Sequence, residues 1–292
     1  MKMLQIVQRA TGVLALAATL WVAPAAQAAY VVGGAAQSLI PNSGDWAWDG
    51  AFLAGFRGAL EDPANFGPGG IVNRSISTVT LGTVDAGSLA GVNMFVGTWI
   101  NDTDAAPISA AVKSFFLGGG DLFLLQDSAG RDALGVSLGL ATTLSTGAVS
   151  NGGAPLFNGP FGTAVNVTQL YEVGKLDPAA IAILGGHIGG VNVDGEVTSA
   201  FWKAGEYAPG AGALFVIADI DMIATTTFCG LPLCGADYNP LNDNGRYALN
   251  TFSFLQQNGG SPLPEPGTLV LLGLGLAVVA ATRRRQSVPR LG

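Results

Sequence analysis

The chain has 292 residues, of which 43 are glycine, 49% are hydrophobic and 11% are charged, with two cysteines and one histidine. This length suits one large domain or two small ones, and the apolar content excludes a wholly disordered chain. The formal charge of −7 argues against a nucleic-acid-binding protein, which needs a basic face, and a single histidine leaves little room for zinc chemistry.

Residues 1–28 have the three parts of a secretory signal peptide. Lys2 and Arg9 precede a short apolar run, and Ala26 and Ala28 are the small residues of an A-x-A cleavage site. We therefore predict cleavage after Ala28 and export of the mature chain. An ordinary N-terminal helix is the alternative interpretation.

The charge total changes once the two ends are set aside. Residues 29–266 hold seven basic and twenty acidic side chains, which gives a formal charge of −13. A body with this charge repels anionic polymers and attracts cations.

The first half of the body alternates strand-like and helix-like segments. Aromatic residues at helical spacing after Asp45 predict the first helix, with Asp45 as its cap. Thr103 or Asp104 is expected to cap the second helix, and three consecutive glycines end it. The expected elements are a strand at 30–33, a helix over 46–60, strands over 75–81 and 91–98, a helix over 105–117 and a nearly continuous apolar strand over 121–126.

The second half continues the alternation after a segment of different character. The expected elements are a helical turn over 132–140, β-rich or irregular structure over 141–170, a strand over 211–218, a last helix over 245–257 capped by Asn242-Asp243-Asn244, and a linker over 258–263. Strands separated by helices predict an α/β domain over 29–257 with a mostly parallel central sheet flanked by helices. The stretch near 141–170 is expected to be an insertion into that sheet.

Four motifs of the body occur in a familiar order. They are VGTWIND, GGGDLFLLQDS, ALFVIADIDMI and NDNGRYALNTFSFL. This order is similar to that of class I glutamine amidotransferase-like domains of exported bacterial proteins, and the resemblance covers about residues 30–257. It implies a flavodoxin-like sheet. It does not imply amidotransferase activity, because the nucleophilic cysteine after the central strand and its Cys-His-Glu triad are absent here.

The C-terminal segment has three parts. They are the box Pro264-Glu265-Pro266, the uncharged stretch 266–282 and the basic cluster Arg283-Arg284-Arg285. The stretch is somewhat shorter than the roughly 20 residues that a spanning helix needs, and the positive-inside rule places the basic cluster in the cytoplasm. We expect a transmembrane helix over 266–282, with the body on the outer side of the membrane.

This segment closely resembles the PEP-CTERM sorting signal of Gram-negative bacteria. The resemblance covers residues 264–292 and implies processing by an exosortase, a membrane protease-transpeptidase, with cleavage near 264–266. It further implies a bacterium that makes exopolysaccharide, and delivery to the cell surface or matrix. A simple tail anchor is the alternative interpretation.

One candidate nucleophile follows the central predicted strand. Ser128 lies in the stretch QDSAG, where a nucleophile elbow exposes a serine between a strand and a helix, although Gln126 replaces the first glycine of that motif. His187 is the candidate base, with Asp219 or Asp221 to orient it. A helix cap is the simpler interpretation of Ser128, so whether the chain is an enzyme stays open.

A second candidate is a cation site. Asp219 and Asp221 project to one face if the preceding strand continues, and Asp243, between Asn242 and Asn244, offers further oxygen atoms. Calcium takes six to eight oxygen ligands, and ligands gather at the carboxyl ends of strands in open α/β sheets. We therefore consider calcium as a ligand of these residues. The alternative is that Asp243 caps a helix and the other carboxylates are solvated in loops. No other cofactor is expected.

The two cysteines and the tryptophans suggest further features. Four residues separate Cys229 from Cys234, which predicts a short-loop disulfide in an exported chain and disfavours a redox motif. An aromatic surface suited to sugar stacking is the second feature, with core packing as the alternative. Its residues are Trp46, Trp48, Asp49 and Trp99.

Together these features predict an exported, exosortase-sorted protein of the cell surface or biofilm matrix. They favour a non-enzymatic role over a catalytic one. Exosortase is the expected processing partner and polysaccharide the expected ligand class. Contact with the membrane is expected only through the C-terminal helix before processing. A surface hydrolase using Ser128 and His187, or a calcium- or carbohydrate-binding module, is the alternative.

Overall fold

The computed structural model describes residues 28–127, 130–147, 149–170, 173–225 and 235–260. Residues Ala29–Ser261 form one compact unit, here called the body. Across the described ranges, no helix is both long enough and apolar enough to span a bilayer.

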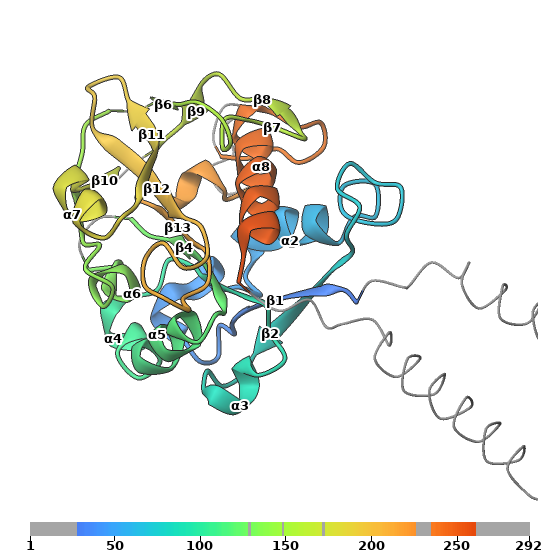
Figure 1. The fold of residues 1–292 in the computed structure, drawn as a ribbon, viewed down its shortest axis with the longest axis vertical. Helices are drawn as coiled ribbons and strands as arrows, with labels where there is room; N and C mark the ends of the chain where they lie inside the picture. Colours follow the sequence, from blue (N-terminus) through green and yellow to red (C-terminus); the bar gives the residue numbers. More distant parts are fainter. Residues whose placement is uncertain (1–27, 128–129, 148, 171–172, 226–234, 261–292) are drawn as a thin grey trace, which may run out of the picture. The chain divides into compact units, whose positions relative to one another are not determined.

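Five parallel strands form the centre of the body, in the order β2-β1-β3-β4-β13 (Figure 1). Every residue of β3, β4 and β13 is buried, as expected for parallel strands covered on both faces. The predicted parallel central sheet is therefore confirmed. The strands are β1 (Tyr30–Ala35), β2 (Ile76–Leu81), β3 (Met94–Gly97), β4 (Asp121–Leu125) and β13 (Leu214–Ile217).

An antiparallel extension continues the sheet beyond β13. There β12 (Val197–Trp202) pairs with β13 and with β11 (His187–Asn192). The stretch 141–170, predicted to be β-rich or irregular, contains short strands, and the antiparallel pairing continues beyond it through a further short strand to β12. These strands are β5 (Thr142–Leu144), β6 (Val149–Asn151), β9 (Val167–Thr168) and β10 (Gly174–Leu176), with a separate hairpin of β7 (Asn158–Gly159) and β8 (Gly162–Thr163).

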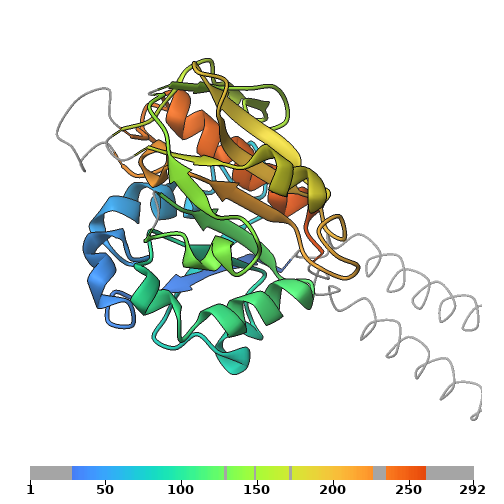
Figure 2. The same ribbon diagram turned by 90° about the vertical axis from the view of Figure 1, so that its left-hand side faces the viewer.

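Helices cover both faces of the sheet (Figures 1 and 2). Alternate side chains of β4 divide between two cores: Phe123 packs in the cluster that includes α2 (Ala54–Glu61) and α8 (Asp243–Asn258), whereas Leu124 packs in the opposite cluster. The second face carries α3 (Ala86–Leu89), α4 (Asp102–Ala105), α5 (Ser109–Leu117), α6 (Ala133–Val136) and α7 (Pro178–Ile183).

The prediction of a helix over 46–60 is wrong for most of its first half. The chain has short 3-10 turns, η1 (Pro41–Trp46) and η2 (Ala51–Leu53), before α2, and Asp45 is not a cap. A Cβ atom on Gly34 would lie 2.4 Å from Cγ of Trp48, so that ring packs directly on the backbone of β1. Ala47 is extended, which turns the indole of Trp48 into the core instead of continuing a helix.

The helix predicted over 105–117 is also interrupted. It consists of α4 and α5, and the side chain of Asn101, rather than Thr103 or Asp104, accepts the capping hydrogen bond of α4. Pro107 lies between the two helices and lacks the N–H that an unbroken helix would need. The last predicted helix is confirmed as α8, with Asn242 as its cap.

Candidate ligand-binding site at the carboxyl edge of the sheet

Three partly exposed aromatic side chains meet where β1 and β3 end. Trp46 closes η1, Phe52 lies in η2 and Trp99 follows β3. The ring centroid of Trp46 lies 4.7 Å from that of Phe52 and 6.0 Å from that of Trp99. The strands β2 and β3 lie on opposite sides of β1, so the direction in which strands are added to the sheet reverses here. Ligands of open α/β sheets bind at such reversals. We call these three residues the aromatic cluster.

Charged groups lie directly beside the aromatic cluster. The indole Nε1 of Trp99 donates a hydrogen bond to Oδ2 of Asp127 at 2.8 Å. The guanidinium of Arg131 lies 4.3 Å from the centroid of the same indole, within the range of a cation–π contact. The cluster therefore combines apolar ring surface with one carboxylate and one cation.

Two further carboxyl groups lie near Asp127. Asp219 and Asp221 follow β13, and both are buried. Burial raises the pKa of Asp219 well above its ordinary value, and the charges of Asp221 and Asp127 raise it further. Burial, followed by the charge of Asp127, raises the pKa of Asp221 to about 8. The carboxyl edge of the sheet therefore holds protons near neutral pH.

The geometry of Asp219 and Asp221 differs from the sequence expectation. The strand β13 ends at Ile217, so the two side chains do not alternate along a continuing strand. Instead, Oδ1 of Asp219 accepts from the backbone N–H of Asp221 at 2.8 Å and caps the 3-10 turn η3 (Ile220–Met222). The other oxygen, Oδ2, accepts from the N–H of Leu170 at 3.1 Å.

The third residue of the predicted cation site, Asp243, lies in the first turn of α8. Its Oδ2 accepts from the N–H groups of Val165 and Asn166 at 3.1 and 3.0 Å, and its Oδ1 accepts from Arg246 at 3.0 Å. Within the described part of the chain, no group of three or more His, Cys, Asp or Glu is arranged to hold a metal ion. Calcium binding by Asp219, Asp221 and Asp243 stays a prediction.

His187 is exposed at the start of β11. Its Nε2 lies 3.1 Å from Oε2 of Glu206, and its ring stacks on Phe201 with centroids 5.1 Å apart. Neither Asp219 nor Asp221 is the carboxylate that contacts it.

The sheet register explains this separation. His187 pairs with Phe201, which pairs with Phe215 at the start of β13, whereas Asp219 and Asp221 follow the end of β13. The structure therefore does not bring these carboxylates to the histidine. Ser128 lies outside the described residues, and a hydrolase based on it stays a prediction.

The aromatic surface predicted from sequence is only partly assembled. Trp46 and Trp99 meet, but Trp48 is fully buried against Phe56, with centroids 6.3 Å apart, and belongs to the core. The carboxylate of Asp49 accepts from the N–H of Gln37 at 2.7 Å.

Phe52, Asp127 and Arg131 are members of this site that the sequence reasoning missed. Asp127 is next to Ser128 in the QDSAG stretch, so its position after β4 was a usable signal. Nothing in the sequence pairs Arg131 with the ring of Trp99.

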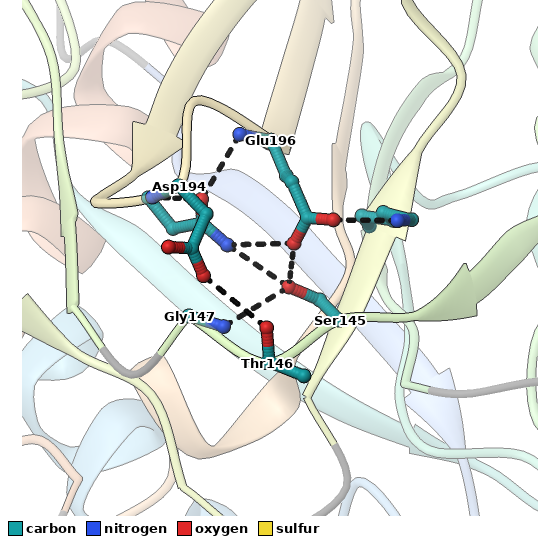
Figure 3. A network of polar contacts seen from close by, with 7 residues as sticks. Ser145, Thr146, Gly147, Asp194 and Glu196 are labelled. Carbon is teal, nitrogen blue, oxygen red and sulfur yellow. Dashed lines mark hydrogen bonds and ion pairs between the residues drawn. The ribbon is translucent and has the colours of Figure 1, made fainter.

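A separate polar network joins two loops of the antiparallel extension. Figure 3 shows Glu196 beside Ser145, whose hydroxyl donates to Oε2 of Glu196. The same Oε2 accepts from Nδ2 of Asn192 at 3.1 Å, and Oε1 accepts from Nζ of Lys175 at 2.5 Å. Hydrogen bonds from Lys175, then Ser145 and Asn192, lower the pKa of Glu196 to about 2. Since both oxygen atoms of Glu196 are engaged within the network, it holds the loop at 145–147 to the turn between β11 and β12.

The remaining predicted functional residues lie outside the described ranges. They are Ala26, Cys229, Cys234, Pro264, Glu265, Pro266, Arg283, Arg284 and Arg285, together with the helix expected over 266–282. Ala28 is the first described residue.

Comparison with solved structures finds remote likenesses. The chain is 15% identical to the mmIFT52 N-terminal domain, with a TM-score of 0.39, over 63% of this chain and 85% of that one. It is 12% identical to the exo-beta-1,4-mannosidase Op5Man5 from Opitutaceae bacterium strain TAV5, with a TM-score of 0.39, over 62% of this chain and 28% of that one. It is 11% identical to the cytoplasmic protein STM3548 from Salmonella typhimurium, with a TM-score of 0.42, over 72% of this chain and 87% of that one.

Comparison with sequences is informative for the tail alone. A search of curated proteins finds no match to the chain. Residues 262–285 match the PEP-CTERM protein-sorting motif, which confirms the sorting signal predicted from the Pro-Glu-Pro box, the apolar stretch and the arginine cluster. The chain thus carries a motif that implies export, processing by an exosortase and sorting to the cell surface.

Proposed function

We propose that this exosortase-sorted protein binds polysaccharide at the surface, or in the biofilm matrix, of a Gram-negative bacterium, and that it does so without catalysis. The sorting motif supports the surface location. The observation that carries the binding proposal is the partly exposed pair Trp46 and Trp99, bordered by Asp127 and Arg131.

The chemistry of this cluster suits a sugar. The apolar face of a pyranose packs on an aromatic ring, and its hydroxyl groups exchange hydrogen bonds with carboxylate and guanidinium groups. The formal charge of −13 on residues 29–266 favours a neutral polysaccharide, or one bridged by cations, over a strongly anionic chain.

The order of the five parallel strands supports a finer description of the body. If the five parallel strands alone are numbered in chain order, β13 becomes the fifth, and their order in the sheet is 2-1-3-4-5. This is the strand order of a flavodoxin-like sheet. We infer a glutamine amidotransferase-like domain with this topology, in which the antiparallel extension is inserted between the fourth and fifth strands. In this proposal the domain binds a ligand at the strand reversal and has no amidotransferase activity.

The binding proposal is tested by affinity electrophoresis in gels that contain exopolysaccharide purified from the producing bacterium. We expect the polysaccharide to retard the mature protein, and Trp46→Ala and Trp99→Phe each to reduce the retardation at least fivefold. Ile183→Ala is the matched control, because Ile183 is an apolar residue that is 84% exposed on α7. Equal retardation of all four proteins, or none, contradicts the proposal.

The sorting proposal is tested separately by the intact mass of the protein in each cell fraction. A mass that begins at Ala29 and ends near Pro264, with or without an added group, is the expected result. Protein that retains residues 283–292 and occurs only in the inner membrane contradicts it.

A further inference from the structure

A buried carboxyl group joins the two ends of the body. Asp121 opens β4 and is fully buried. Its Oδ2 accepts a hydrogen bond from the Tyr30 hydroxyl at 2.5 Å, and its Oδ1 accepts from the N–H groups of Ala213 at 2.8 Å and Gly260 at 3.2 Å. Tyr30 begins the first strand, and Gly260 is the last described residue before the tail. One side chain therefore ties the first strand and the centre of the sheet to the last residues of the body.

The glycines around Asp121 leave no space for side chains. A Cβ atom on Gly259 would lie 2.0 Å from Oδ2 of Asp121, and one on Gly212 would lie 2.9 Å from Oδ1 and 2.1 Å from the carbonyl oxygen of Gly120. The backbone of Gly259 thus packs directly against the carboxyl group. The first residues of the segment predicted as a linker over 258–263 belong to the folded body.

Two further contacts hold the last turn of α8. The guanidinium of Arg74 lies 4.4 Å from the ring centroid of Tyr30, and its Nη1 donates to the carbonyl of Gln256 at 3.0 Å. The N–H of Ala204 donates to the carbonyl of Asn258 at 3.0 Å. The chain is therefore held at three successive points, Gln256, Asn258 and Gly260.

We propose that Asp121 sets the boundary between the folded body and the cleavable tail, and thereby confines sorting cleavage to residues after Gly260. A peptide segment bound inside a folded body enters a peptidase only after local opening. Pro264 follows Gly260 by four residues, at most about 14 Å of extended chain, so the expected cleavage region begins directly after this contact. Asp121 acts through the Gly260 amide and is a positioning residue. The inference rests on the exosortase processing proposed above.

The test uses the full chain produced in a bacterium that has an exosortase, with the C-terminus of the matured protein read by intact mass. The wild type should give C-termini after Gly260 only. Asp121→Ala should add forms that end at or before Gly260, which the wild type lacks, whereas Asp121→Asn, which keeps an acceptor oxygen, should resemble the wild type. Asp132→Ala is the matched control, because Asp132 is also buried and accepts a backbone hydrogen bond, from Thr142.

A second variant covers the case in which Asp121→Ala fails to fold. Gly260→Pro removes the donor N–H and leaves Asp121 in place, and the extended conformation of Gly259, with φ −69° and ψ 153°, is one that a following proline favours. It should give the same additional forms as Asp121→Ala.

Limited digestion of the purified full chain with subtilisin separates this inference from the sorting proposal. Cutting between residues 255 and 259, at bonds that do not flank position 260, should be at least tenfold faster in Asp121→Ala and Gly260→Pro than in the wild type and Asp132→Ala. Equal rates in all four proteins, or the same new cut in Asp132→Ala, overturn the role of Asp121. Wild-type protein that keeps its tail in cells, with the expected digestion pattern, overturns the sorting proposal alone.

Discussion

Buried carboxyl groups make the stability of the body depend on pH. The pKa of Asp221 is about 8, because of burial and the charge of Asp127, and that of Asp121 is about 6, because of burial. The folded chain therefore keeps protons that the unfolded chain releases above about pH 4. For groups of this kind, the free energy of unfolding is highest in acid and falls as the pH rises through the folded-state pKa.

We expect the melting temperature to be higher at pH 5 than at pH 8.5, and Asp221→Asn to make this difference smaller. Calorimetry at constant ionic strength measures both. Asp85→Asn is the control, because the backbone N–H of Ser88 lowers the pKa of Asp85, so this group is ionised at both pH values and its removal should leave the difference unchanged. An Asp221→Asn variant with the wild-type pH dependence would show that this group is not responsible.

Calcium binding at the carboxyl edge would compete with the same protons. A cation that binds the ionised forms of Asp219 and Asp221 displaces protons, so its affinity rises with pH. We expect millimolar Ca²⁺ to raise the melting temperature more at pH 8.5 than at pH 6, and Asp219→Ala with Asp221→Ala to abolish the rise. Mg²⁺ at the same ionic strength is the control. No response to Ca²⁺ at either pH contradicts the prediction.

The helix α8 illustrates how local signals and packing can agree. Asn242 accepts from the N–H of Gly245 at 2.8 Å as the cap, and the buried side chains of Tyr247, Phe252 and Leu255 pack on the central strands. The expected boundaries, 245–257, differ from the observed ones by no more than two residues at either end.

Removal of this cap should destabilise the body measurably. We expect Asn242→Ala to lower the free energy of unfolding by about 1 kcal/mol, because the first turn of α8 loses an acceptor for a backbone N–H. Urea unfolding followed by circular dichroism measures the difference. Asp177→Ala, which removes the cap of the exposed helix α7, is the comparison. No change in Asn242→Ala would show that water replaces the cap without loss.

The segment before α2 shows the opposite outcome. Its aromatic spacing predicts a helix from residue 46, but Trp48 packs on Gly34 and the chain becomes extended at Ala47. Burial of the Trp48 indole against the backbone of β1 outweighs local helix propensity, which amounts to less than about 1 kcal/mol per residue.

The body has its own core and its own terminal contacts. Residues 29–261 form one compact unit with buried side chains on both faces of the sheet. We therefore expect a chain shortened to 29–261 to fold, with a melting temperature within about 2 °C of that of the full chain. Calorimetry of the two proteins in the same detergent-containing buffer checks this. A loss of cooperative unfolding in the shorter chain contradicts it.

The amino-acid sequence was sufficient for features that depend on neighbouring residues. The sorting motif, the alternation of strands and helices and the cap of α8 each lie within a few tens of residues, so composition and spacing reveal them. The burial of central strands likewise follows from their continuous apolar character.

Contacts between distant segments required the folded structure. Asp121 meets Gly260 across 139 positions, and Trp99 meets Asp127 only because β3 and β4 are neighbours in the sheet. The register of β11 and β12 places His187 near the start of β13, away from Asp219. The pairing of these strands depends on which buried faces of distant segments pack together in the whole chain.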